Sequence, residues 1–472
     1  MKRALLITLI MVFLALLSYA AWPEAVMKVE GNDVYIWTRL YKAVVNKTTG
    51  FLEDYYTNTR SFSKINLDSD KKRAWIFKYG GDGYDVLVNE KEASLTTVSL
   101  KVNGKEGITD LLTRDNIKLT FLQRVNVNGK LIEFEKTYIF HNTPNYTHEV
   151  RVKVLKNPIN AKISVIIPRI GPINKPNESS TLFISYTEKH RKILMSSASS
   201  GVLNSKGIVN LGKTNIIDIK SYMGPVKVTL ITRYLDNTDN VKKIIRSLPK
   251  GYKWYDTLFY AMVHSLDWLY SITRNYGWAI IVFTVLIRLV LYPLFAVQTK
   301  SMAQNMKIQP EMEKIKKKYK DPKKQQEELM KLYKKHGVNP MGGCLPLLIQ
   351  MPIFFLLYGV IIYFGDQFPY SSRFFIWNDL SKGGIGVNIV FILLEVVISV
   401  YQSTLTARDK KQVWQSSLMF IVFSFFIVYL PSGLFLYYTV SSALQLLQTA
   451  YINKKLGIKG MKLRELFATS KR

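Results

Sequence analysis

The sequence predicts a polytopic α-helical membrane protein that carries one large extracytoplasmic β-sandwich domain. Three observations predict this architecture. The 472-residue chain is 48% hydrophobic and has a formal net charge of +31, which excludes both a disordered polycation and a single compact core. Its first half alternates apolar and polar residues with period two, as strands do. Its second half contains apolar runs long enough to cross a bilayer.

The first residues are expected to form a transmembrane anchor. In "MKRALLITLIMVFLALLSYAAW", Lys2 and Arg3 precede an uncharged run. The run reaches about the 20 residues that span a bilayer, although Ser18 and Ala20 are spaced like a signal-peptidase site. A retained anchor and a cleaved signal both fit, and we favour residues 1–22 as a retained anchor.

Residues 23–250 are predicted to form one β-sandwich domain. Stretches such as "IKLTFLQRVNVNGKLIEFEKTYIF" and "VKVTLITRYL" are rich in Val, Ile, Thr and aromatic residues and are expected to be strands. Turn signals at Asn103-Gly104, Asn128-Gly129 and Gly224-Pro225 punctuate them without intervening helices. This pattern is typical of an antiparallel sandwich.

One stretch of this domain, "GIVNLGKT" at residues 207–214, matches the phosphate-loop pattern. That motif binds phosphate when a strand enters the loop and a helix leaves it. The residues that follow, "NIIDIKSYMGPVKVTL", are strand-like. We therefore predict a hairpin turn here rather than a nucleotide site.

A predominantly helical region follows the β domain. In residues 251–275, polar residues such as Asp256 and Asp267 interrupt an aromatic-rich apolar run, which favours an amphipathic helix at the membrane surface over a cap on the β domain. Residues 276–298 are predicted to be a span. Residues 344–452 are predicted to contain four further spans with short loops, which makes six spans with the N-terminal anchor.

Residues 299–343 are predicted to be a cytoplasmic hairpin of two helices broken at Asp321-Pro322, with Met306 and Met312 facing Leu332 and Tyr333. Twelve lysines and five acidic residues lie between residues 298 and 344. The short loop near residue 410 and the tail 453–472 are also basic. The positive-inside rule therefore places both termini, the hairpin and the tail in the cytoplasm and the β domain outside. These basic elements fit docking of RNA or anionic lipid and a merely solvated surface equally well.

Polar residues form stripes within the predicted spans. Thr284 and Arg288 are four residues apart and share one helix face. A charged group at mid-bilayer costs about 3 kcal/mol, so the stripes are expected to face one another around a water-containing cavity. Arg288 and Glu395 lie at depths that permit an ion pair, which would either lock two helices together or leave a positive site for substrates. The other stripe residues are Ser399, Gln402, Thr406, Tyr438, Ser441, Gln445 and Gln448.

The sequence predicts no enzyme, no catalytic residue, no metal and no cofactor. The five histidines are scattered, no HExxH motif occurs, and Cys344 is the single cysteine.

Three long motifs resemble the YidC/Oxa/Alb family of membrane protein insertases. They are "TVLIRLVLYPLFAVQTKSMAQNMKIQPEMEKIKKKY", "NPMGGCLPLLIQMPIFFLLY" and "PSGLFLYYTVSSALQLLQ". The resemblance implies a five-helix insertase core in the bacterial inner membrane and an outer domain like a sugar-binding supersandwich. It also implies a hydrophilic groove, open to the cytoplasm and to lipid, that admits the polar flank of nascent membrane proteins.

The resemblance assigns Arg288, Thr284 and Tyr438 to this groove. It assigns to the exit path of the apolar segment Leu348 and Phe354 on one span and Phe423 and Phe426 on another. The Sec translocon is an expected partner, as are the ribosome and the signal recognition machinery through the hairpin and tail. From the stripes themselves we add Glu395, Gln402 and Gln445 as candidate substrate-binding residues.

Two other classes of protein remain alternatives. A solute or proton-coupled transporter also uses intramembrane Arg and Glu, but it predicts inverted repeats and broken helices at matching positions. A structural receptor that only anchors the β domain has no need of polar stripes on several spans.

Overall fold

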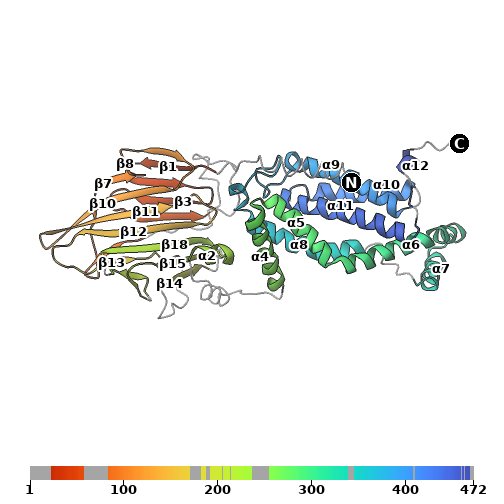
Figure 1. Ribbon diagram of the computed structural model, residues 1–472, viewed down its shortest axis with the longest axis horizontal. Coiled ribbons are helices and arrows are strands. Elements are labelled where there is room, and N and C mark those ends of the chain that lie inside the picture. Colours follow the sequence, from red (N-terminus) through yellow and green to blue (C-terminus); the bar gives the residue numbers. More distant parts are fainter. Residues whose placement is uncertain are drawn as a thin grey trace. The chain divides into compact units, whose positions relative to one another are not determined.

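The computed structural model describes residues 23–57, 83–168, 170, 182–187, 192–204, 206–212, 214–235, 255–337, 345–407, 410–458, 460–461 and 463–467. The anchor predicted for residues 1–22 lies outside this part of the chain. The structure divides into a β-rich unit, Ala21–Tyr255, and a helical unit, Asp256–Arg472 (Figure 1).

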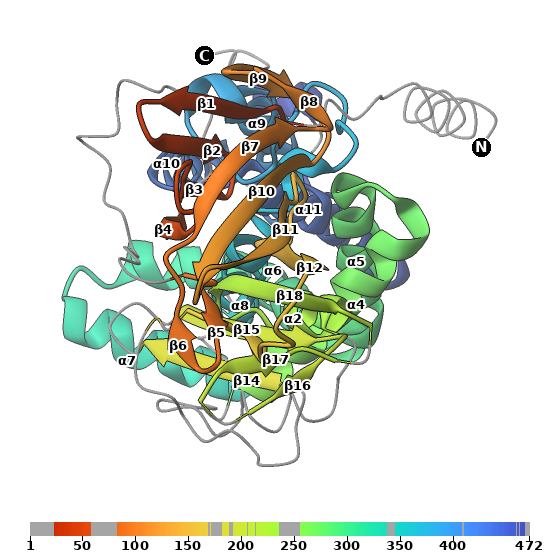
Figure 2. The same ribbon diagram turned by 90° about the vertical axis from the view of Figure 1, so that its left-hand side faces the viewer.

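The β-rich unit contains three sheets, and its described strand pairings are antiparallel (Figure 2). The largest has the order β14-β15-β18-β12-β11-β10-β7-β8, and the smaller sheets are β4-β3-β2-β1-β9 and β16-β17-β13-β5-β6. The strands are β1 (Ala25–Glu30), β2 (Asp33–Trp37), β3 (Tyr41–Asn46), β4 (Leu52–Thr57), β5 (Val86–Val88), β6 (Lys91–Glu92), β7 (Thr96–Val102), β8 (Lys105–Glu106), β9 (Asp110–Thr113), β10 (Ile117–Val127), β11 (Lys130–Phe140), β12 (Thr147–Lys156), β13 (Ile163–Ile166), β14 (Leu182–Thr187), β15 (Lys192–Ala198), β16 (Val202–Leu203), β17 (Ile208–Asn210) and β18 (Ile216–Pro225).

The two predicted Asn-Gly turns are confirmed. Asn128 and Gly129 have φ of 52° and 78°, and they close the β10–β11 hairpin in which Val127 pairs with Lys130. Two consecutive positive φ values are what a tight hairpin turn requires, and Asn-Gly tolerates them best. Asn103-Gly104 closes the β7–β8 hairpin in the same way.

The predicted turn at Gly224-Pro225 is wrong. Strand β18 continues through both residues, with Gly224 opposite Ile193 of β15. Glycine is needed here because an added Cβ would lie 2.7 Å from the ring of Tyr146. The glycine thus makes room for a close contact inside a strand instead of turning the chain.

The strand predicted from "VKVTLITRYL" is also wrong, since Val228–Tyr234 forms helix α2. Pro225 has no amide hydrogen and ends the sheet ladder. Residues Val228 to Ile231 are all buried, so tertiary packing outweighs the strand preference of their β-branched side chains.

The phosphate-loop match at residues 207–214 forms no phosphate loop in the described residues. Ile208–Asn210 is strand β17, which pairs with β13 and β16, and the next described element is strand β18. No helix N-terminus follows the glycines, so the arrangement that cradles phosphate is missing from this stretch.

The two smaller sheets pack on one face of the large sheet, which makes the unit a sandwich. Tyr41 of β3 tilts against Phe140 of β11 with ring centroids 6.5 Å apart. Tyr84, next to β5, donates a hydrogen bond to Ser221 of β18 at 2.6 Å and pairs with His148 of β12 at 2.8 Å. The core is therefore aromatic and partly polar.

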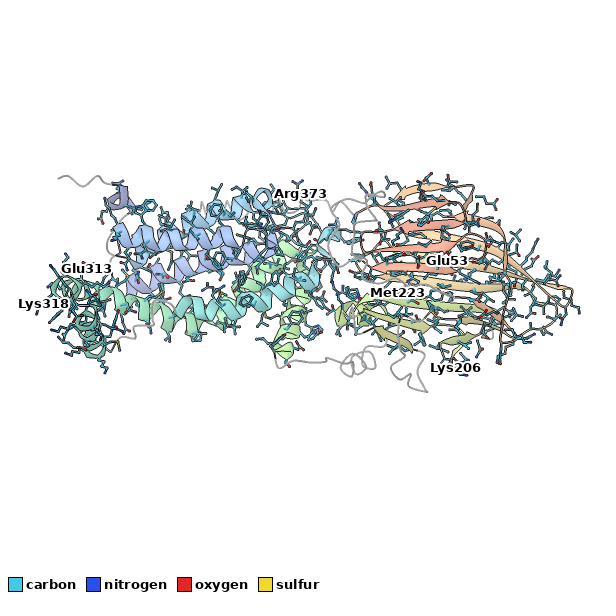
Figure 3. The ribbon with its side chains drawn as sticks, turned by 180° about the vertical axis from the view of Figure 1, so that it is seen from behind. Glu53, Lys206, Met223, Glu313, Lys318 and Arg373 are labelled. Carbon is cyan, nitrogen blue, oxygen red and sulfur yellow. The ribbon has the colours of Figure 1, made fainter. Side chains whose placement is uncertain are left out.

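The helical unit begins after residue 255. Figure 3 shows Glu313 and Lys318 on its hairpin and Arg373 on the loop before α9. Its elements are α4 (Asp256–Thr273), α5 (Tyr276–Val290), α6 (Tyr292–Lys318), α7 (Pro322–Lys335), α8 (Leu345–Phe364), η3 (Phe368–Tyr370), α9 (Ile385–Thr406), α10 (Lys410–Phe426), α11 (Ser432–Lys455) and α12 (Leu463–Phe467).

The span predicted for residues 276–298 is broken. Helices α5 and α6 meet at Leu291 with a bend of 70°, and Pro293 lies in the first turn of α6. Because proline has no amide hydrogen, the ladder of helical hydrogen bonds is interrupted there. Helix α6 then continues past residue 298, where we expected the span to end.

Among helices of the described residues, α9 alone is long and apolar enough by itself to cross a membrane. The bent pair α5 and α6 meets the same criterion only when taken together. Helices α8, α10 and α11 occupy the other predicted spans. The number of spans therefore stays a prediction.

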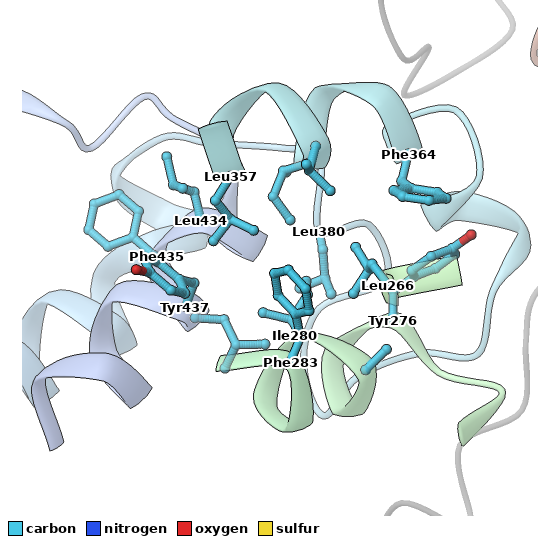
Figure 4. Packing of buried hydrophobic residues seen from close by; sticks show 14 of the residues in the cluster. Leu266, Tyr276, Ile280, Phe283, Leu357, Phe364, Leu380, Leu434, Phe435 and Tyr437 are labelled. Atoms are coloured by element: carbon cyan, nitrogen blue, oxygen red, sulfur yellow. The ribbon is translucent and has the colours of Figure 1, made fainter. Parts of the chain in front are cut away.

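The largest cluster of buried apolar side chains among the described residues of the helical unit comes mainly from α4, α5, α8, α9, α11 and the loop before α9 (Figure 4). Helix α5 begins at a strong cap, because Asn275 accepts a hydrogen bond from the amide of Gly277 at 2.9 Å. The labelled members of the cluster are Leu266, Tyr276, Ile280, Phe283, Leu357, Phe364, Leu380, Leu434, Phe435 and Tyr437.

The break between the hairpin helices lies at Asp321-Pro322, where Asp321 caps α7. The Tyr333 hydroxyl lies 3.6 Å from the Met312 sulfur, as we expected. Met306 differs, because it packs with Ala303 and with Ile458 from the segment after α11. That segment thus folds back onto α6.

Candidate functional site

Arg288 lies in the last turn of α5 and is only 8% exposed. Its Nε and Nη2 atoms donate to the Ser441 hydroxyl of α11 at 3.0 and 2.7 Å, and Nη2 also donates to Gln445 Oε1 at 3.3 Å. Helices α5 and α11 pack together, and Ser441 and Gln445 are one turn apart, so they meet the guanidinium side by side.

These partners orient the guanidinium without neutralising it. The ring of Phe295, at the start of α6, lies 4.1 Å from the guanidinium carbon. This is a cation–π contact between residues on either side of the bend at Leu291. The Nη1 atom is buried and has no hydrogen-bond partner among the described residues. Arg288 therefore keeps a positive charge and a free donor.

Two further predicted residues lie on the same helices as Arg288 and its partners. Thr284 is fully buried one turn before Arg288, and its hydroxyl donates to the carbonyl of Ile280 at 2.6 Å. Tyr438 of α11 is half-buried, with its ring centroid 6.1 Å from that of Phe423 on α10.

Glu395 does not pair with Arg288, which corrects the ion pair that the depths permitted. It is 4% exposed on α9, and its carboxyl group lies next to the hydroxyls of Thr439 and Ser442 on α11. Arg288 instead bonds to Ser441. Neighbouring helix positions point about 100° apart, so the two charges meet different faces of α11.

At Gln402, by contrast, the polar residues of α9 do contact those of α11, as we expected. Its Nε2 atom donates to Thr449 Oγ1 of α11 at 3.0 Å. The residues that sequence reasoning left out of the site are Phe295 and Tyr437. Tyr437 lies beside Arg288 and Ser441 and also accepts a hydrogen bond from Gln350 of α8 at 2.9 Å. Aromatic residues are common in protein cores, so nothing in the sequence indicated that these two belong to the site. Only their contacts in the structure show it.

The expected exit-path residues are placed differently from one another. Phe354 is buried in the helical core, whereas the next residue, Phe355, is 60% exposed. Phe423 is half-buried on α10. The side chains of Leu348 and Phe426 lie outside the described part of the chain.

Within the described residues, no group of three or more His, Cys, Asp or Glu side chains could hold a metal ion. What the site offers is a fixed positive donor on α5 and hydroxyl, amide and carboxyl groups on α9 and α11. These groups can bind and orient a polar ligand.

Comparison with known proteins finds membrane protein insertases, with one match that covers nearly the whole chain. A family model described as 60Kd inner membrane protein matches residues 268–459. The membrane protein insertase YidC of Thermotoga maritima is 36% identical over 468 residues, which cover 99% of this chain and 98% of that protein. The membrane protein insertase YidC of Helicobacter pylori is 34% identical over 298 residues, 59% of this chain and 51% of that protein.

Solved structures agree. A crystal structure of an active YidC insertase with the first transmembrane domain resolved is 34% identical, with a TM-score of 0.72 over 95% of this chain and 98% of that chain. A crystal structure of YidC from Thermotoga maritima is 28% identical, with a TM-score of 0.58 over 90% of this chain and 98% of that chain.

Proposed function

This chain belongs to the family of YidC membrane protein insertases, and from that premise we propose that it inserts and folds nascent membrane proteins in the inner membrane through a hydrophilic groove that Arg288 lines. The polar flank of the substrate enters the groove from the cytoplasm. Its apolar segment then moves sideways into lipid. This cycle uses no cofactor and no nucleotide.

The observation that carries the proposal is the state of Arg288. It is buried, held by neutral partners, and retains an unpartnered Nη1 donor among the described residues. A charge that served only to lock helices would be expected to meet a carboxylate. An arginine left in this state suits binding of an acidic or polar flank, because the flank supplies the missing acceptor.

The polar stripes support a low barrier to translocation. Moving a polar flank across hydrocarbon is costly because its backbone groups lose their hydrogen bonds. Thr284 on α5, Gln402 on α9 and Gln445 on α11 supply polar groups along the expected path. Tyr438 offers a hydroxyl and an aromatic face at the groove. A wet and shortened path lowers the barrier without an energy source.

The apolar segment is proposed to leave between α8 and α10. Phe423 on α10 contributes to this path, together with Leu348, Phe354 and Phe426 as the family resemblance assigns them. Phe355 is an exposed aromatic residue on α8, so we add it as a contact for the leaving segment.

The proposed topology follows the positive-inside rule. The predicted domains are residues 1–22 as anchor, 23–250 as periplasmic domain, 251–275 as interfacial helix, 276–298 as the arginine span, 299–343 as hairpin, 344–452 as four spans and 453–472 as tail. Both termini are cytoplasmic. Exposed Leu258, Trp268 and Ile272 on α4 suit insertion into the membrane surface.

The basic hairpin and tail are the proposed docking elements for ribosomes, the signal recognition machinery and anionic lipids. The Sec translocon is a further proposed partner. We propose that the protein acts either together with the translocon or independently of it. The lysines of α6 and α7 are largely exposed, so they can approach phosphate or acidic groups at low desolvation cost.

The test is insertion of a single-span substrate with an acidic flank into proteoliposomes that contain the full-length protein and no energy source. Arg288→Glu is expected to lower the insertion rate by at least about tenfold, because it replaces attraction by repulsion in a low-dielectric site. Arg373→Glu is the matched control, since that exposed arginine lies on the loop before α9.

Two outcomes would contradict the proposal. Insertion by the wild-type protein no faster than into protein-free liposomes would reject the insertase function. Native insertion by Arg288→Glu would reject the electrostatic role of Arg288.

A further inference from the structure

Helix α11 presents polar groups to two different sides of the helical unit. Ser441 and Gln445 face Arg288 of α5. Thr439 and Ser442 lie next to Glu395 of α9, and Thr449 contacts Gln402. We call the first set the arginine side and the second set the α9 side.

Two unpartnered atoms on the α9 side are hydrogen-bond acceptors, and a third, Thr439 Oγ1, is a hydroxyl that can donate or accept. Glu395 Oε1 and Gln402 Oε1 are buried and have no hydrogen-bond partner among the described residues, although the Thr439 and Ser442 hydroxyls lie beside the Glu395 carboxyl group. Glu395 is 4% exposed. The two residues are seven positions apart on α9, so they lie on one face two turns apart. On the arginine side the unpartnered atom is a donor, Nη1 of Arg288.

The orientation of the Gln402 amide follows from its neighbour. Thr449 uses its hydroxyl hydrogen in a bond to the carbonyl of Gln445 at 2.8 Å. The hydroxyl oxygen is then left to accept, so the Gln402 group that faces it must be the NH₂. The amide oxygen therefore points elsewhere as a free acceptor.

Buried acceptors without partners are costly and are rarely retained without a role. An extended polypeptide flank carries both N–H donors and C=O acceptors on every residue except proline. Arg288 can satisfy only acceptors, because a guanidinium has no lone pair to offer. A second surface with free acceptors would satisfy the donors of the same flank.

We propose that Glu395 is a specificity-determining residue which, with Gln402, accepts hydrogen bonds from N–H groups of the substrate's polar flank. The inference rests on the proposed insertase function and names the chemistry of its substrate. Backbone amides, Asn and Gln side chains and lysine ammonium groups are the donors that fit. Arg288 binds the acceptors of the flank from the other side of α11.

The test compares three single-span substrates that differ only in two flank residues, which are Asp, Asn or Lys. Each is inserted into vesicles of phosphatidylethanolamine and phosphatidylglycerol that contain the full-length protein. Glu395→Leu is expected to lower insertion of the Asn and Lys substrates by about fivefold, the value of one net hydrogen bond. The Asp substrate should lose less, because at the two varied positions it offers only backbone N–H donors.

Two further variants sharpen the comparison. Glu395→Gln keeps an acceptor oxygen without the charge, so only the Lys substrate should lose insertion. Leu394→Ala is the matched control, because Leu394 is the adjacent residue and faces outward on α9. An equal loss for all three substrates, or no loss for any, would overturn the proposal.

A contact measurement tests the proposal independently of the insertion rate. A cysteine at Gln402 is expected to form a disulfide with a cysteine in the flank of a ribosome-arrested substrate. If Gln445→Cys forms the crosslink and Gln402→Cys does not, the flank does not contact the α9 side. That result would overturn this inference and leave the proposed function intact. Absence of wild-type insertion above protein-free vesicles would instead reject the proposed function.

Discussion

Lys136 in the β-rich unit and Arg288 in the helical unit are both buried cations, yet their surroundings differ. Lys136 is fully buried in the sandwich core, where its Nζ donates to the carbonyl of Tyr84 at 2.5 Å and lies 5.4 Å from the ring centroid of Tyr138. Arg288 donates to the side-chain oxygens of Ser441 and Gln445.

The two cations differ in how readily they lose their proton when buried. Burial lowers the pKa of Lys136 from 10.5 to about 7, and the nearby Asp85 opposes this shift. The lysine can thus shed its proton and become a neutral part of the core. Arginine does not give up its proton in proteins. A core that needs only packing can use lysine, whereas a site that must present a charge needs arginine.

The largest expected effect concerns Lys136 and pH. Its folded pKa lies below its unfolded value, so between pH 7 and about pH 10 the unfolded chain binds more protons, and stability rises with pH by about 3 kcal/mol. Lys136→Met should flatten this rise. Hydrogen exchange of the amides of β10 to β12 in the full-length protein measures it.

The control is Lys153→Met, which replaces an exposed lysine on β12. It should retain the wild-type pH dependence. The same slope in Lys136→Met and in the wild-type protein would show that Lys136 is not the titrating group, and the comparison with Arg288 would fail.

A smaller effect is expected from Ser441→Ala. Its hydroxyl accepts from both Nε and Nη2 of Arg288, so its loss leaves Nε without a partner and leaves Nη2 only its longer bond to Gln445. The free energy of unfolding of the helical unit should fall by about 2 kcal/mol. Denaturation by sodium dodecyl sulfate in mixed micelles measures it.

Ser271→Ala is the control for that measurement, since Ser271 is exposed and bonds only within α4. It should change stability little. A Ser441→Ala protein as stable as this control would mean that Arg288 is held by other groups.

The smallest expected effect tests the need for arginine. Arg288→Lys should lower insertion of acidic-flanked substrates by about fivefold near neutral pH, because lysine cannot reproduce the paired hydrogen bonds to Ser441. The deficit should grow as the pH rises, since a buried lysine sheds its proton readily. Insertion rates at pH 6 and pH 9 check this, with wild-type protein as reference.

Equal insertion by Arg288→Lys and the wild-type protein at both pH values would break the comparison. It would mean that a lysine at position 288 stays protonated and binds the substrate as well as Arg288 does.

Much of the fold could be predicted from local patterns. The Asn128-Gly129 hairpin was predictable because its positive φ values depend on the two residues themselves. The turn predicted at Gly224 was wrong because a glycine is needed there to leave room for the ring of Tyr146, which is distant in sequence. The strand predicted at Val228–Tyr234 failed for a similar reason, since packing outweighed propensity.

The helical unit shows the same division. Apolar runs predicted helices at α8, α9, α10 and α11, because a helix that meets lipid must be apolar along its length. The bend between α5 and α6 was not predicted, since the apolar run continues through Pro293.

The sequence by itself determined that Arg288 lies inside an apolar helix and that polar residues repeat along α9 and α11. Helical periodicity and composition are local properties, and they can be read without knowing any neighbour. The rotation of each helix about its own axis was decided only by tertiary packing. That rotation turned Ser441 and Gln445 toward Arg288 and left Glu395 beside Thr439 and Ser442, so the two charges became separate sites instead of an ion pair.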